Sequence, residues 1–182
     1  MNWVNTVFML AATFLAVFWE ADLQGLRHLL GAQIDLLPPL MVYAALSLSL
    51  FDVCLLAFLG GLWFDSLSAN PLGISVLPLF AAGFAVYIIR EIILRDQPFA
   101  QFVLGLSASA IVPILTLVIL LTKGHAPLMG WGTTWQLVVM SIGGAAATPV
   151  FFVLFEWLNR SLTHSRITET SFRPDREIRR GR

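Results

Sequence analysis

Long apolar runs, separated by short polar stretches, follow one another along the chain. A transmembrane helix needs about 20 mostly apolar residues, and charged residues are rare inside it. Four stretches fit this pattern clearly and predict membrane-spanning helices: Trp3 to Trp19, Ile74 to Ile89, Gln101 to Leu121 and Thr134 to Leu158.

The apolar stretch from Ile34 to Phe64 is too long for one span. As a single helix it would be about 46 Å long, whereas the hydrocarbon core is about 30 Å thick. Asp52 interrupts it, and a carboxylate there can cap the free N–H groups of a new helix. We therefore expect two helices, Leu36 to Leu50 and Val53 to Phe64, and six helices in all.

Composition supports a lipid environment for most of the chain. Hydrophobic residues make up 58% of it and charged residues 12%, and mean hydropathy is +0.81. Soluble domains carry roughly 25% charged residues, so this chain cannot cover a water-facing surface with polar groups. We expect an all-α, polytopic membrane protein, with one transmembrane domain (1–158) and a basic, disordered cytoplasmic tail (159–182).

The basic residues predict the orientation, because cytoplasmic loops collect Lys and Arg. Seven of the eleven follow Leu158, which places the C-terminus in the cytoplasm, and Arg90, Arg95 and Arg160 are assigned to the cytoplasmic surface. With six spans both termini are cytoplasmic and nine of the eleven basic residues lie inside. Five spans would place ten inside, so helix length rather than charge favours six.

Catalytic motifs are missing from the sequence. The three histidines, His28, His125 and His164, fall in expected loops or the tail, and no nucleophile, zinc or phosphate-loop pattern occurs. Asp52 and Asp65 are thirteen residues apart, about 20 Å along a helix, and cannot share a proton. We predict no enzyme activity, no metal or other cofactor, and no nucleic-acid partner.

Asp65 raises a separate question, because it stands where a helix leaves the membrane. The polar turn after it contains Asn70, Pro71 and Gly73, which set extended and tight backbone geometry. Asp65 is interpreted as a turn organiser that accepts hydrogen bonds from loop amides. Contact with a partner protein and ion binding are the alternatives.

Small residues recur at a spacing of four in the later spans. Such residues let helix backbones approach closely in lipid, where packing replaces the hydrophobic drive. They serve either packing within the bundle or a groove for another protein's helix, and the assigned positions are Gly60, Gly61, Gly105, Ser109, Gly143, Gly144 and Ala147.

Two stretches resemble the bacterial rod-shape-determining protein MreD family. One is Phe58-Leu59-Gly60-Gly61-Leu62-Trp63-Phe64-Asp65, followed by Asn70-Pro71-Leu72-Gly73. The other is the basic loop Arg90 to Arg95, followed by Gln97-Pro98-Phe99-Ala100-Gln101-Phe102. The similarity covers roughly residues 34 to 121, and the Arg-rich tail is not part of it.

The resemblance implies a six-helix inner-membrane protein whose fold resembles the substrate-binding subunits of energy-coupling-factor transporters. It implies a non-catalytic scaffold that binds a single-span MreC-like protein and works with an MreB-like filament, a RodA-like glycosyltransferase and its transpeptidase. The alternative is a subunit that captures a small, vitamin-type molecule for transport. That alternative requires a pocket with converging polar groups, for which the outer loops offer Gln33, Asp35, Asn70, His125 and Trp131.

Overall fold

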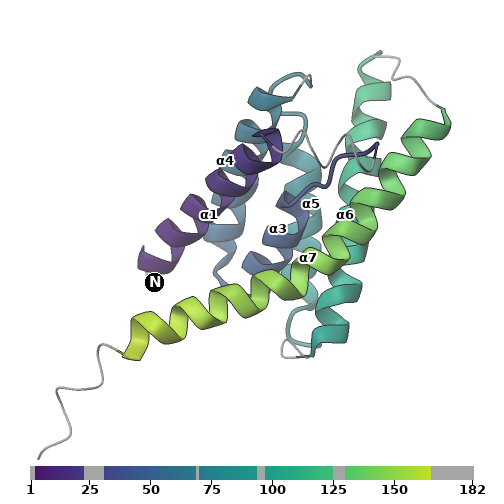
Figure 1. The fold of residues 1–182 in the computed structure, drawn as a ribbon. Coiled ribbons are helices and arrows are strands. Elements are labelled where there is room, and N and C mark those ends of the chain that lie inside the picture. The colour runs from purple at the N-terminus through teal and green to yellow at the C-terminus, as the bar shows by residue number, and fades with distance from the viewer. Residues whose placement is uncertain (1–2, 23–30, 69, 94–96, 125–129, 165–182) are drawn as a thin grey trace, which may run out of the picture.

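The computed structural model describes residues 3–22, 31–68, 70–93, 97–124 and 130–164. These residues form an all-α bundle, as the sequence predicts (Figure 1). Its six helices are α1 (Trp3–Asp22), α3 (Leu37–Ser47), α4 (Leu50–Leu67), α5 (Val76–Ile89), α6 (Pro98–Thr122) and α7 (Trp131–His164).

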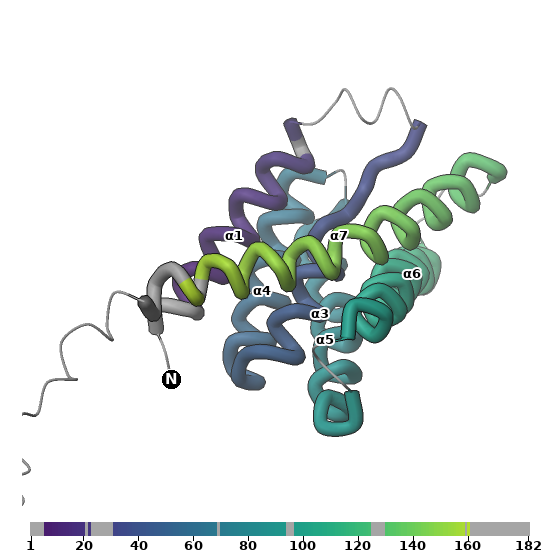
Figure 2. The backbone as a smooth tube through the Cα atoms, turned by 60° about the horizontal axis from the view of Figure 1, so that its bottom comes forward, coloured from purple at the N-terminus to yellow at the C-terminus, as the bar shows by residue number. Residues whose placement is uncertain are grey.

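Helix α3 lies at the centre of the bundle. It packs against each of the other five helices (Figure 2), and ten of its eleven residues are buried. The helix is shorter than the predicted span from Leu36 to Leu50. Eleven residues give about 16 Å, roughly half of a hydrocarbon core. Because protein surrounds α3, its length is not set by the thickness of the lipid.

The break between α3 and α4 has a local cause. Ser49 caps α4: its backbone N–H donates to the Asp52 carboxylate (3.1 Å), and its hydroxyl oxygen accepts from the Asp52 N–H (3.4 Å). This reciprocal arrangement is a capping box. Thr6 of α1 also donates to Asp52, at 2.7 Å. Helix α4 therefore begins three residues earlier than the predicted Val53, and Asp52 lies inside its first turn.

Three of the helices are long and apolar enough to cross a membrane: Leu50–Leu67, Pro98–Thr122 and Trp131–Leu158. Three shorter apolar stretches accompany them: Thr6–Glu20, Leu37–Ser47 and Val76–Ile89. Several such helices in one bundle support a multi-pass membrane protein. Helix α7 continues to His164, beyond the expected end at Leu158, so the first residues of the expected tail are helical.

The start of α1 and the end of α7 lie at the same end of the bundle, which we call the terminal end (Figure 1). Helices α1, α4 and α6 finish at the opposite, distal end. Helix α7 leaves the distal end beside α6 and crosses the bundle obliquely to the terminal end (Figure 1).

Small residues lie where helices approach most closely. At Gly105 an added methyl group would overlap the Thr148 side chain, and at Gly144 it would overlap the Ser109 hydroxyl, so both bring α6 against α7. At Gly61 the added carbon would lie 2.9 Å from the Val76 Cα of α5. The remaining assigned glycines also face this chain: Gly60 faces Thr13 and Leu37, and Gly143 faces Ile34. Ala147 is half-buried.

Candidate functional site

Asp65 lies in the last turn of α4, and only 2% of its surface is exposed. Its carboxylate accepts two hydrogen bonds from Ser75, one from the backbone N–H (3.1 Å) and one from the hydroxyl (2.5 Å). Ser75 is the N-cap residue of α5. The negative charge therefore lies at the N-terminal end of a helix, where free N–H groups and the helix dipole favour it.

The residues between Asp65 and Ser75 form a tight turn at the distal end. Asn70 donates its N–H to the Ser68 hydroxyl (3.3 Å), and Ile74 donates to the Pro71 carbonyl (3.3 Å). Gly73 has a φ of 86°, a backbone conformation that favours glycine. Pro71, Leu72 and Gly73 are exposed. The hydrogen bonds from Ser75 to Asp65 thus hold the two ends of this turn together.

A buried polar cluster that the sequence did not reveal joins α1, α7 and the segment before α3. The Gln33 side-chain amide N–H donates to the Glu20 carboxylate (2.9 Å), and the Leu36 backbone N–H donates to the same carboxylate (3.4 Å). Gln136 exchanges two hydrogen bonds with the Gln33 backbone (3.2 and 3.0 Å). Glu20 lies one residue beyond the predicted span Trp3 to Trp19, but in the structure it belongs to α1 and is buried.

Asp35 is the second buried acid of this region, with 5% of its surface exposed. One carboxylate oxygen accepts the Leu37 N–H at 2.9 Å. Burial raises the pKa of Asp35 to about 6 from its ordinary value of 3.8, because an apolar environment disfavours the charged form. The local sequence indicates this burial only through the apolar neighbours of Asp35, which are Ile34 and Leu36.

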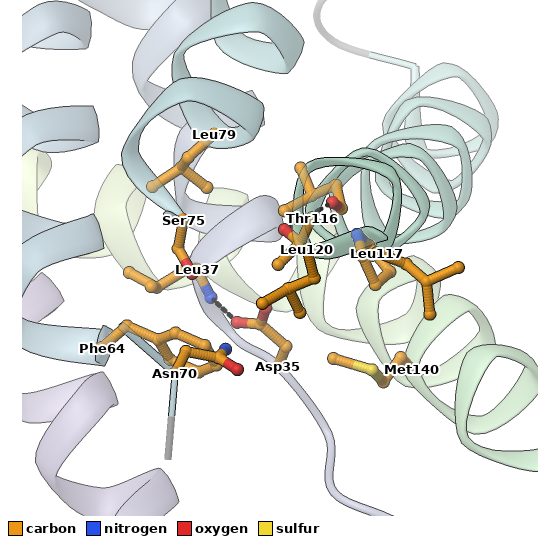
Figure 3. Close-up of a pocket in the computed structure, with 12 residues that line it drawn as sticks. Asp35, Leu37, Phe64, Asn70, Ser75, Leu79, Thr116, Leu117, Leu120 and Met140 are labelled. Carbon is orange, nitrogen blue, oxygen red and sulfur yellow. Dashed lines mark hydrogen bonds between the residues drawn. The ribbon is translucent and has the colours of Figure 1, made fainter. Parts of the chain in front are cut away.

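Asp35 opens onto a cavity at the distal end (Figure 3). The cavity has a volume of ≈ 170 Å³, and its walls come from the segment before α3, from the turn after α4 and from α3, α4, α5, α6 and α7. The lining residues are Asp35, Leu37, Phe64, Asn70, Ser75, Leu79, Val112, Pro113, Thr116, Leu117, Leu120 and Met140. Asp35 and Asn70, both predicted as outer-loop polar groups, meet here. Trp131 is exposed, and His125 lies outside the described residues.

Two of the three arginines assigned to the cytoplasmic surface, Arg90 and Arg160, lie at the terminal end. Arg90 donates to the Leu48 carbonyl at the α3–α4 break (3.0 Å), and its guanidinium lies 4.0 Å above the Tyr87 ring. Arg160 pairs with Glu156 at 3.7 Å on the exposed side of α7. Arg95 lies outside the described residues. Arg90 therefore closes a helix junction as well as placing positive charge at this end.

Within the described ranges, no three His, Cys, Asp or Glu side chains gather to hold a metal ion. Asp52 and Asp65 lie at opposite ends of α4, each with its own hydrogen-bond partners. His164 is the last residue of α7 rather than part of an irregular tail, and His28 and His125 lie outside the described residues.

The apolar helices support a multi-pass α-helical membrane protein, and its distal end carries a hydrogen-bonded turn and a small acidic cavity. Comparison of the chain with protein-family models, curated proteins and solved structures finds no significant match.

Proposed function

We propose that this chain is a non-catalytic scaffold of the bacterial wall-elongation machinery, similar to MreD. It lies in the inner membrane with both termini in the cytoplasm and binds a single-span MreC-like protein. An MreB-like filament and a RodA-like glycosyltransferase with its transpeptidase are the further partners. The resemblance of residues 34 to 121 and the six-helix bundle support this proposal.

The observation that carries the proposal is the conformation of the two motif segments. Phe58 to Asp65 and Asn70 to Gly73 form one unit, because Asp65 holds Ser75 just beyond the turn. The connection between Asp65 and Ser75 presents apolar side chains outward: Leu67 and Leu72 are 56% and 70% exposed. A rigid turn with exposed leucines at a membrane edge suits contact with the segment of a partner that leaves the same membrane.

The proposed scaffold function requires no catalytic residue. A scaffold that holds several proteins in one membrane patch raises the effective concentration of each for the others. Basic residues at the terminal end would face the filament and the anionic leaflet, to which each contributes about 1 kcal/mol of attraction.

Co-purification from membranes tests the proposal. Tagged protein should recover a single-span, coiled-coil partner, and Leu72→Gln should reduce that recovery because it places an amide in the apolar contact. Leu121→Gln is the matched control, since Leu121 is also an exposed leucine at the distal end but belongs to α6. Equal recovery with both variants, at unchanged thermal stability, would contradict the assignment of the turn as the contact surface.

A second candidate function is the capture of a small molecule for transport. The cavity beside Asp35 and Asn70 favours it. Recovery of ABC-type ATPases in the same co-purification, in place of a single-span partner, would support this function over the scaffold.

A further inference from the structure

The cavity at the distal end is large enough for a small organic molecule. Its volume is ≈ 170 Å³, and an engineered apolar cavity of about 150 Å³ holds benzene. Apolar side chains of leucine, phenylalanine, methionine, valine and proline form most of its walls (Figure 3). An apolar body of about the size of a phenyl ring therefore matches the space.

The polar groups of the cavity act mainly as hydrogen-bond acceptors. A hydroxyl has one hydrogen to donate. The Ser75 hydroxyl donates its hydrogen to Asp65 (2.5 Å), and the Thr116 hydroxyl donates its hydrogen to the Val112 carbonyl (2.9 Å). Both oxygens are left with lone pairs, and the Asp35 carboxylate adds acceptor sites. The Asn70 amide supplies the donors of this lining.

The charge of the cavity is negative and uncompensated among the described residues. Asp35 is its charged lining residue, and one of its oxygens accepts the Leu37 N–H. In the described part of the chain, no basic side chain lies within ion-pair distance of Asp35 or of the neighbouring buried acid Glu20. A buried carboxylate is unfavourable unless a cation or several hydrogen bonds compensate it.

This donor set disfavours a metal ion. Ca²⁺ takes six to eight oxygen ligands, and Mg²⁺ keeps an octahedral shell. Here one carboxylate faces walls of apolar carbon, and no three potential ligands cluster among the described residues. An ammonium group suits these walls better, because it brings three donors and one positive charge on an apolar body.

We propose that the distal cavity binds a small organic amine, with its ammonium group on Asp35 and its apolar body between Phe64 and Leu120. This site does not depend on the wall-elongation role, because its evidence is confined to the cavity. The two can therefore fail separately.

Binding of 4-fluorobenzylamine to the purified full-length protein in detergent, followed by ¹⁹F NMR, tests the proposal. Asp35→Asn keeps an acceptor for the Leu37 N–H but removes the charge, so affinity should fall about tenfold or more. Asp22→Asn is the matched control, since Asp22 is an exposed acid at the same end, and it should leave binding unchanged. The neutral 4-fluorobenzyl alcohol should bind more weakly and should not distinguish wild type from Asp35→Asn.

Further variants keep the test decisive if Asp35→Asn does not fold. Leu120→Phe fills the cavity and should abolish amine binding, whereas Thr116→Val removes one acceptor at nearly constant shape and should weaken it. Equal amine affinity in wild type and Asp35→Asn, or no binding to wild type, would overturn the proposal. Binding that appears only in Arg27→Gln would also overturn it, because Arg27 of the chain itself would then be the partner of Asp35.

Discussion

Asp65 and Asp35 are both buried carboxylates of the distal end, but the structure satisfies them differently. Asp65 accepts two hydrogen bonds from Ser75, so its carboxylate faces the N-terminus of α5. Asp35 accepts one bond from the Leu37 N–H and faces a cavity. At the scale of single residues, the first therefore organises the fold, and the second carries an unfavourable charge that a ligand can offset.

Removal of the Asp65 carboxylate should destabilise the protein. Asp65→Ala leaves the Ser75 N–H buried without a partner, which costs about 1–3 kcal/mol, whereas Asp65→Asn keeps one acceptor oxygen and should cost less. Thermal unfolding in detergent, followed by tryptophan fluorescence, measures the difference. Ser66→Ala is the control, since the exposed Ser66 hydroxyl donates to the Trp63 carbonyl of its own helix. Unchanged stability of Asp65→Ala would show that the hydrogen bonds between Asp65 and Ser75 contribute nothing to the free energy of unfolding.

Asp35 should make stability decrease as pH rises. The pKa of Asp35 is about 6 in the folded protein, against an ordinary value of 3.8 that applies to the unfolded chain. The folded state therefore binds the carboxyl proton more tightly than the unfolded state does. The contribution of Asp35 to stability is then greatest below about pH 4, decreases up to about pH 6 and is constant above, a change of at most about 3 kcal/mol. Melting temperatures between pH 4 and 7.5 should show this slope in wild type and a smaller one in Asp35→Asn. The Glu20→Gln variant measures how much of this pH dependence comes from the neighbouring acid. An unchanged slope in Asp35→Asn would contradict the assignment of the pH dependence to Asp35.

At the scale of elements, the sequence predicts what depends on local pattern. The apolar runs indicate both ends of α1, α5 and α6 and the start of α7 to within three residues, whereas α7 continues six residues beyond its predicted end. The Ser49–Asp52 cap explains why the chain breaks where Asp52 interrupts the long run. The length of α3 was not predictable in this way. It follows from burial by five other helices, which is a property of the assembled bundle.

The close contact of α6 with α7 predicts a repairable packing defect. Gly144→Ala would push a methyl group into the Ser109 hydroxyl, and such overpacking costs about 1–3 kcal/mol. Ser109→Gly removes the obstacle, so the double variant should recover part of the loss, and the two changes should not add. Thermal unfolding of the two single variants and the double variant measures the coupling. Ala146→Leu, at an exposed position of α7, is the control; strict additivity would contradict this contact.

At the scale of the whole molecule, the two ends differ in chemistry. The buried acids Glu20, Asp35 and Asp65 lie at the distal end together with the cavity, whereas the Arg90 and Arg160 side chains and the capped, buried Asp52 lie at the terminal end. The turn around Asp65 could be proposed from its residues because they are close in sequence. The cavity could not, since Asp35, Phe64, Thr116 and Met140 meet only after folding. The burial of Asp35 has no local signal for the same reason.

The arrangement of helices predicts which residues face each side of the membrane. Asp22 is the last residue of α1 and Leu72 lies in the turn after α4, both at the distal end, whereas Glu91 follows α5 at the terminal end. All three positions are exposed and can carry single cysteines in a Cys54→Ser background. If the terminal end is cytoplasmic, a membrane-impermeant maleimide should label the first two variants in cells with a permeabilised outer membrane, and Glu91→Cys only after lysis. Asp22→Cys separates the two topologies, because a five-span chain would place it in the cytoplasm. Protection of Asp22→Cys together with labelling of Leu72→Cys would therefore contradict the parallel course of α1 and α4 across the membrane.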